Sequence, residues 1–265
     1  MKSNSSNPMG AILYFYFFIF LYVIVSLIEW TSHFYIMHQN GIVKMIHDNI
    51  IKINTNHIDH HLETRLDQSL VDDFKEEGLV FNIMKIDVFL LVVVTIISGY
   101  LFWLYFPNAK QCLSLPLILL SAFVVSYGYF YYWNSIHTHY HKHYIETNKP
   151  LSKNPAITLY SPLPHFIPDE TSYLYKYLLW YHTIHHLTKG EDKGNYNIIC
   201  PLFDFIFGTY KYTVDNTKHF ANHSPKTERE EWLKQHISFD IRVLDNNTLE
   251  YKDKGTSVWN KLPSL

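Results

Sequence analysis

Residues 11–28 read AILYFYFFIFLYVIVSLI, and none of these 18 residues carries a charge. Two more uncharged stretches follow, VFLLVVVTIISGYLFWLYFP at 88–107 and the 26 residues of 111–136. About 20 apolar residues in a helix are enough to cross the hydrocarbon core of a bilayer. Three such stretches in a chain of 265 residues are rare among soluble proteins, so the pattern predicts membrane insertion.

We therefore expect an all-α integral membrane protein with about three transmembrane helices, at 10–29, 88–107 and 115–136; a four-span arrangement with a re-entrant helix stays open. The first span is expected to be a retained anchor, because its apolar run is long for a signal peptide and no small-residue cleavage site follows. A membrane-embedded domain is expected over 1–212, and a soluble tail over 213–265 with an amphipathic helix near Glu228–His236.

Composition narrows the classes of function. The formal net charge is −2, which argues against a nucleic-acid binder, since such proteins carry a basic excess or patch. The two cysteines, Cys112 and Cys200, are too few for a disulfide framework or a cysteine zinc site. Histidine is unusually frequent, with 17 residues. Because imidazole is the commonest metal ligand, the positions of these histidines become the main question.

Ten of the histidines fall into four short patterns along the chain: H-x4-H, H-x2-HH, H-x3-H and a second H-x2-HH. At this histidine content, H-x2-HH is expected by chance only about 0.07 times in the chain. The ten candidate metal ligands are His33 and His38, then His57, His60 and His61, then His137 and His141, and finally His182, His185 and His186.

Helical spacing explains three of the patterns. Positions i, i+3 and i+4 share a helix face, so each H-x2-HH is expected to direct three imidazoles toward one point. His33 and His38 differ, because five residues leave them about 140° apart on an α-helix. They converge only if the helix loosens there, or they serve opposite sides of one site. In the third pattern His139 and His143 are an alternative pair on the opposite face; we favour His137 and His141.

Membrane topology gives an independent check. With three spans, all four patterns fall on one side of the bilayer. Of the 22 Lys and Arg residues, only Lys2 and Lys110 fall on the other side. Because cytosolic segments carry an excess of Lys and Arg, the histidines are expected to face the cytosol.

Ten imidazoles are too many for one tetrahedral ion, and they suit two ions that each keep a position open. Two neighbouring redox metals at a membrane face are suited to activating O2 against an unactivated C–H bond, and the spans would offer an apolar approach for a lipid chain. Neutral ligands leave the metal charge uncompensated, so carboxylates are expected to hold imidazole N–H groups. The candidates are Glu29, Asp59, Glu63 and Asp204.

These patterns, followed by Asn195-Tyr196 and by DFIFGT at 204–209, resemble the fatty acid hydroxylase superfamily, which contains sterol desaturases, sterol methyl oxidases and fatty acyl or ceramide hydroxylases. The resemblance covers roughly residues 20–212. It implies that the ten histidines hold two iron ions, with Asn195 as a further supporting residue. It also implies O2 as co-substrate, a lipid substrate, an external electron donor such as cytochrome b5 with its NAD(P)H reductase, and the endoplasmic reticulum in a eukaryotic host.

Two features depart from that resemblance and bear on the substrate. Asn197 stands where the family often has Gly, and the segment between His141 and His182 is long compared with the acyl hydroxylases. Hydroxylation and desaturation are not separated by the sequence. The alternatives are a membrane metal-binding or transport protein and a catalytically inactive relative. A zinc hydrolase is disfavoured because the chain has no HExxH pattern.

Overall fold

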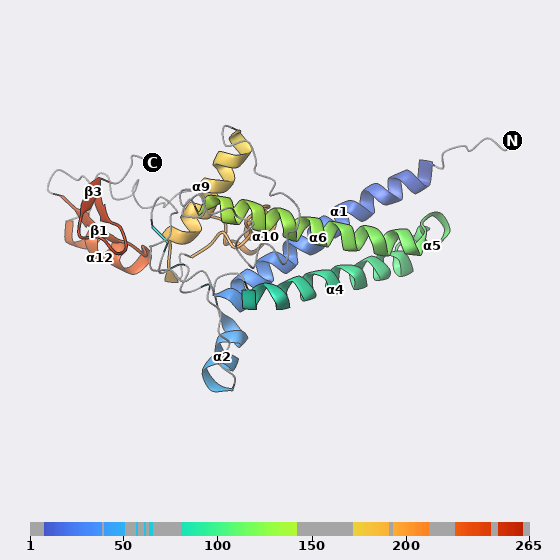
Figure 1. The fold of residues 1–265 in the computed structure, drawn as a ribbon, viewed down its shortest axis with the longest axis horizontal. Coiled ribbons are helices and arrows are strands. Elements are labelled where there is room, and N and C mark those ends of the chain that lie inside the picture. The colour runs from blue at the N-terminus through green and yellow to red at the C-terminus, as the bar shows by residue number, and fades with distance from the viewer. Residues whose placement is uncertain are drawn as a thin grey trace.

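The chain is mostly helical in the computed structural model, as predicted (Figure 1). The residues that the structure describes are 8–38, 40–50, 57, 61, 64–65, 81–141, 172–190, 193–211, 226–244 and 249–261.

Three long helices correspond to the three uncharged stretches of sequence: α1 (Pro8–Thr31), α4 (Phe81–Tyr105) and α6 (Leu115–Tyr140). The short helix α5 (Ala109–Cys112) lies in the turn between α4 and α6. The remaining described elements are the π-helical turn η1 (Ser32–Met37), the helices α2 (Gly41–Asn49), α9 (Tyr173–Leu187), α10 (Leu202–Phe207) and α12 (Lys226–His236), and the strands β1 (Asp240–Val243), β2 (Leu249–Lys252) and β3 (Trp259–Lys261).

The long helices pack side by side over an apolar core (Figure 1). Phe17 of α1, Phe102 of α4 and Ile118 of α6 are buried in that core. Helices α4 and α6 lie close together at Gly99, where an added Cβ would lie 3.2 Å from the Cβ of Ala122. Small residues at this crossing let the two backbones come together, as is common where helices pack in membranes.

The outward faces of these helices are apolar as well. Phe15 is 64% exposed, Ile97 52% and Val124 58%, which a helix in water would avoid on such a scale. Among the described residues, two helical stretches are long and apolar enough to cross a membrane, Met9–Ile46 and Leu115–Trp133. The apolar part of α4, Leu90–Tyr105, is shorter.

The helix that begins as α1 changes its winding near its end. From Ser32 to Met37 it is π-helical, and the amide of His38 donates to the carbonyl oxygen of His33 at 3.1 Å. This i to i+5 bond widens the turn by one residue. The bend after it is held by Asn40, whose side-chain amide donates to the carbonyl of Phe34 at 2.9 Å.

The end of α1, the end of α6 and α9 meet at the end of the helical assembly opposite α5 (Figure 1). Helix α9 begins at a capping residue, Ser172, whose hydroxyl accepts from the amide of Tyr175 at 3.1 Å. Beside it runs the segment 193–201, which leads into α10. Trp30, Tyr196 and Phe203 form a small core that joins α1, this segment and α10.

The C-terminal residues correct the expectation of an all-α protein. After α12 the chain forms a three-stranded antiparallel sheet in the order β1-β2-β3, with Asp240 opposite Lys252 and Tyr251 opposite Asn260. Strands of three or four residues are too short to show alternation in the sequence. This unit packs against the end of α9 through Leu187 and Leu233, and the Ser238 hydroxyl donates to the carbonyl of His186 at 2.7 Å.

Candidate metal centre

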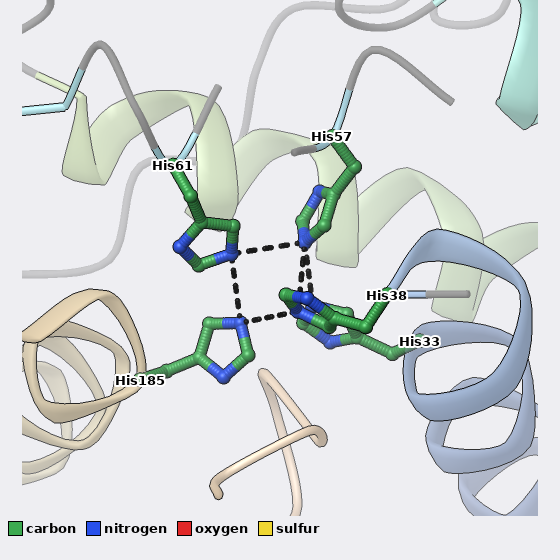
Figure 2. Close-up of side chains that lie close together, drawn as sticks. All are labelled: His33, His38, His57, His61 and His185. Carbon is green, nitrogen blue, oxygen red and sulfur yellow. Dashed lines mark hydrogen bonds between the residues drawn. The ribbon is translucent and has the colours of Figure 1, made fainter. Parts of the chain in front are cut away.

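Nine of the ten candidate ligands come together at the histidine end of the assembly, in two groups. In each group one nitrogen of every imidazole lies within 4.8 Å of all the others. The five-histidine group is His33, His38, His57, His61 and His185 (Figure 2), and the four-histidine group is His137, His141, His182 and His186. All nine are buried except His38, which is half-buried. His60 lies outside the described residues, as do Asp59 and Glu63.

The π-helical turn explains how His33 and His38 reach the same group. On an α-helix they would point about 140° apart. Because η1 carries about one more residue per turn, their rings stack instead, with centroids 5.0 Å apart and an interplanar angle of 19°. Of the two alternatives that the sequence left open, the loosened helix is therefore the one present, and Figure 2 shows both rings projecting from the same stretch of helix toward His57, His61 and His185.

The second H-x2-HH differs from the expectation of three imidazoles at one point. His182 and His186 belong to the four-histidine group, whereas His185 belongs to the five-histidine group. Adjacent residues of a helix are separated by about 100°, so His185 and His186 point to different neighbours. Helix α9 thus contributes to both groups. The ring of His186 stacks on that of His61 at 4.1 Å between centroids, so the two groups are in direct contact.

The third pattern contributes His137 and His141 to the four-histidine group, which is the pair that we favoured. They lie one turn apart near the end of α6, and His137 stacks on Trp133 at 4.7 Å between centroids. His139 carries no described side-chain position, and His143 lies outside the described residues.

The spacing of the nitrogens in the five-histidine group fits a metal ion. The Nε2 atoms of neighbouring rings are separated by 2.9 Å (His33 and His57), 3.1 Å (His57 and His61), 3.1 Å (His61 and His185), 3.1 Å (His185 and His38) and 3.2 Å (His38 and His57). With metal–nitrogen bonds of about 2.1 Å, ligands at right angles lie about 3.0 Å apart, and tetrahedral ligands about 3.4 Å apart. The group therefore fits an ion with more than four positions better than a tetrahedral one.

The four-histidine group has less uniform spacing. The Nε2 atom of His182 is 3.0 Å from that of His186 and 3.4 Å from that of His141. These distances span both coordination angles, so they do not select a geometry. Its donors are nevertheless of the same kind as those of the five-histidine group: four buried imidazoles whose nitrogens lie at the spacing of metal ligands.

Backbone carbonyls fix the orientation of two rings in the five-histidine group. The Nδ1 atom of His33 donates to the carbonyl of Tyr196 at 2.5 Å, and that of His185 donates to the carbonyl of Gly194 at 2.6 Å. A carbonyl accepts only, so Nδ1 must carry the proton and Nε2 presents its lone pair to the group. These are the second contacts that a metal-ligating histidine normally makes.

The two acidic candidates in the described residues, Glu29 and Asp204, accept hydrogen bonds from the segment 196–198 rather than from imidazoles. Glu29 accepts from the Tyr129 hydroxyl at 2.5 Å, the Asn197 side chain at 2.8 Å and the amide of Ile198 at 2.7 Å. Asp204 accepts from the amide groups of Tyr196 and Asn197, at 2.9 and 2.8 Å. Both carboxylates thus hold the segment whose carbonyls orient the histidines. The expectation of direct carboxylate–imidazole contacts is wrong for these two residues.

Asn195 has a similar structural task. Its φ is 59°, a left-handed conformation that asparagine tolerates better than most residues. Its side-chain amide donates to the carbonyls of Tyr181 and Lys211 at 3.0 and 2.8 Å, and its side-chain oxygen accepts from the amide of Lys211 at 2.7 Å. Asn195 therefore ties the segment to α9 and to the chain that follows α10.

Burial controls the charge of the imidazoles. It lowers the pKa of His57, His61, His182 and His185 well below the usual 6.5, and the closeness of other imidazoles, which would repel a second positive charge, lowers it further. The rings are therefore neutral at physiological pH, which is the form that binds metals. Burial also lowers the pKa of Lys193 to about 7.

Several residues beside the five-histidine group were not predicted from the sequence. The Nζ atom of Lys193 lies 3.4 Å from the Nδ1 of His61, and the ammonium of Lys254, from the C-terminal unit, donates to the carbonyl of His61. Position 194 has room only for glycine, because an added Cβ would lie 2.1 Å from the carbonyl oxygen of Thr209. None of these residues belongs to a histidine pattern, and carbonyl groups leave no trace in composition.

Comparison of the chain with protein-family models, with curated proteins and with solved structures returns no match.

Proposed function

We propose that the chain is a membrane-bound non-haem di-iron oxygenase that hydroxylates or desaturates a lipid substrate, such as a fatty acyl chain, ceramide or sterol. The observation that carries the proposal is the pair of adjacent imidazole groups at metal-ligand spacing. His33 and His185 carry their proton on Nδ1, so their Nε2 lone pairs face the group, which is the arrangement that metal ligands need. The resemblance of the histidine patterns to the fatty acid hydroxylase superfamily favours iron among the metals that imidazole suits.

The arrangement of the helices supports a membrane location for this chemistry. In the proposal, α1, α4 and α6 are three spans, and the histidines lie just beyond the bilayer at the end where α1 and α6 finish. The distribution of Lys and Arg favours the cytosol for that end, and in a eukaryotic host the membrane would be the endoplasmic reticulum. The exposed apolar side chains of these helices, such as Phe15 and Val124, would then face lipid.

An apolar cavity beside the five-histidine group supports a lipid substrate. Its walls include Ile28 from α1, His33 from η1, Leu91 from α4, and Phe130 and Trp133 from α6. If α1, α4 and α6 are spans, this cavity would open to hydrocarbon rather than to water, and its walls would exclude water from the reacting carbon. His33 brings one ligand of the five-histidine group to the same cavity.

When bound, the two irons would supply the redox chemistry that activates O2. Hydroxylation converts a C–H bond, O2, two electrons and two protons into C–OH and water, and desaturation uses the same oxidant and electrons but yields two waters and a double bond. The electrons must come from an external donor of the cytochrome b5 type. The residues of this chain hold the ligands in their neutral form, orient two of them through carbonyls and shape the apolar cavity.

The proposal is tested on the purified chain in lipid nanodiscs. We expect about two irons per chain by elemental analysis, and a new hydroxylated or unsaturated lipid when 18O2, NADPH, cytochrome b5 and its reductase are supplied. One labelled oxygen in the product identifies hydroxylation, and an unlabelled alkene identifies desaturation. Lipid analysis of cells that express the chain narrows the substrate first.

The variant His185→Ala is expected to abolish the product while leaving membrane insertion intact. The matched control is Thr183→Val on the same helix, which removes only a hydroxyl that donates to the carbonyl of Leu179 at 2.8 Å. Turnover retained in His185→Ala, or a wild-type chain that binds iron but oxidises no lipid under these conditions, would refute the proposal.

A further inference from the structure

The segment Gly194–Asn197 accepts hydrogen bonds from two of the candidate ligands. Its carbonyls at Gly194 and Tyr196 accept from His185 and His33, both of the five-histidine group. These two histidines come from α9 and from η1, which are far apart in the sequence. One short segment thus sets the ring orientation of two ligands that no shared helix could align.

The position of this segment depends on Asp204. Its carboxylate is fully buried, and four donors surround it: the amides of Tyr196 and Asn197 at 2.9 and 2.8 Å, the Thr209 hydroxyl at 2.6 Å and the Tyr181 hydroxyl. An ionised carboxylate has about four acceptor sites and no donor, so all of them are used.

Among the residues that the structure describes, no hydrogen bond of Gly194–Asn197 reaches the four-histidine group; those to histidines go to His185 and His33. The Nδ1 atom of His182 is buried with no hydrogen-bond partner within the described part of the chain. No carbonyl of Gly194–Asn197 accepts from it. The two groups are therefore held differently, although α9 supplies ligands to both.

We propose that Asp204 is a positioning residue for the five-histidine group alone. By holding the amides at 196 and 197, it places the carbonyls that keep the Nδ1 proton on His33 and His185 and so turn both Nε2 lone pairs toward the metal. This inference rests on the metal centre of the proposed function. It assigns to the two metal sites different dependences on one carboxylate.

The substitution Asp204→Asn isolates this role. It keeps the size of the side chain, so no cavity opens, but it places an NH2 group among four donors. At least one backbone amide then loses its acceptor, and the segment must move. Loss of an outer partner of a metal ligand typically lowers metal affinity about 10- to 100-fold.

Metal binding reports the effect without relying on turnover. The metal-free protein in nanodiscs is titrated with Co2+ against a competing chelator, and the visible spectrum of the bound ion reports its coordination. The wild-type chain is expected to bind two ions. His137→Ala disables the four-histidine group and leaves one tight ion, in the five-histidine group.

Adding Asp204→Asn to His137→Ala is expected to weaken that remaining ion by about 10- to 100-fold and to alter its spectrum. Asp204→Asn alone is expected to leave one ion bound as tightly as before. The matched control is Asp240→Asn, which removes a carboxylate paired with Lys252 at 2.9 Å in the exposed C-terminal sheet and should change neither ion.

A second variant keeps the test decisive if Asp204→Asn does not fold. Thr209→Val removes one donor from Asp204 and the acceptor of the Trp30 indole N–H at 3.0 Å, and it should weaken the same ion by a smaller factor. The inference is overturned if the remaining ion in His137→Ala is insensitive to both changes, or if both ions weaken alike. A chain that binds two ions but oxidises no lipid refutes only the proposed function, and a chain that binds none refutes both.

Discussion

Replacing Gly194 by Ala tests whether the carbonyl segment holds the metal site. The added Cβ would lie 2.1 Å from the Thr209 carbonyl oxygen and 2.8 Å from the Lys211 Cγ. Ordinary contact requires about 3.5 Å, so the segment must move away from Thr209 by more than about 1 Å. The hydrogen bond from the amide of Asn195 to that carbonyl, 3.0 Å long, would stretch with it.

The same movement disturbs His185. Its Nδ1 atom lies 2.6 Å from the Gly194 carbonyl oxygen, and a shift of about 1 Å takes this distance beyond the limit of a hydrogen bond. Overpacking costs about 1–3 kcal/mol and the lost hydrogen bond about 1 kcal/mol. We therefore expect the free energy of unfolding to fall by about 2–4 kcal/mol. The affinity of the five-histidine group for metal should fall about 10- to 100-fold, or about 1.4–2.7 kcal/mol.

The assay pairs thermal unfolding with a competitive Co2+ titration of the protein in nanodiscs. The control is Gly128→Ala on α6, where an added Cβ meets nothing within 4 Å; it should leave metal binding unchanged and should not lower stability, because Ala is the better helix former. Metal affinity in Gly194→Ala equal to that of the control would show that the carbonyl does not orient His185, and the reasoning would fail.

Three further results are expected. His137→Ala should lose one of two bound metal ions and His139→Ala neither, which elemental analysis decides; an ion lost in His139→Ala but not in His137→Ala would show that the third pattern was assigned to the wrong pair. Because burial lowers the pKa of His57 and His182 well below 6.5, the unfolded chain binds more protons than the folded one as pH falls below that value. Stability of the metal-free protein should therefore decrease with acid by up to about 1.4 kcal/mol per pH unit for each such imidazole, and urea unfolding that is flat between pH 7.5 and 5.5 would contradict it. Removing metal with a chelator should lower the unfolding temperature and make it rise again with added Fe2+; an unfolding temperature indifferent to both would argue against ligation by these histidines.

Much of the helical framework followed from local pattern. The uncharged stretches predicted α1, α4 and α6, because an apolar segment of about 20 residues that lies in a bilayer must satisfy its backbone hydrogen bonds internally, as a helix does. The histidine patterns predicted which side chains could ligate, because residues one turn apart share a face. The helix near 228–236 was also expected, whereas the C-terminal sheet was missed because its strands are short and pair only through tertiary contacts.

The sequence by itself determined the uncharged helices, the candidate ligands and the two ways in which His33 and His38 could share a site. Only the tertiary structure decided that His185 joins a different group from His182 and His186, and that carbonyls rather than carboxylates orient the rings. Spacing along a helix sets directions relative to that helix alone, so the partner that an imidazole meets depends on how distant elements are placed. A carbonyl is common to every residue, and only the fold selects the ones at 194 and 196.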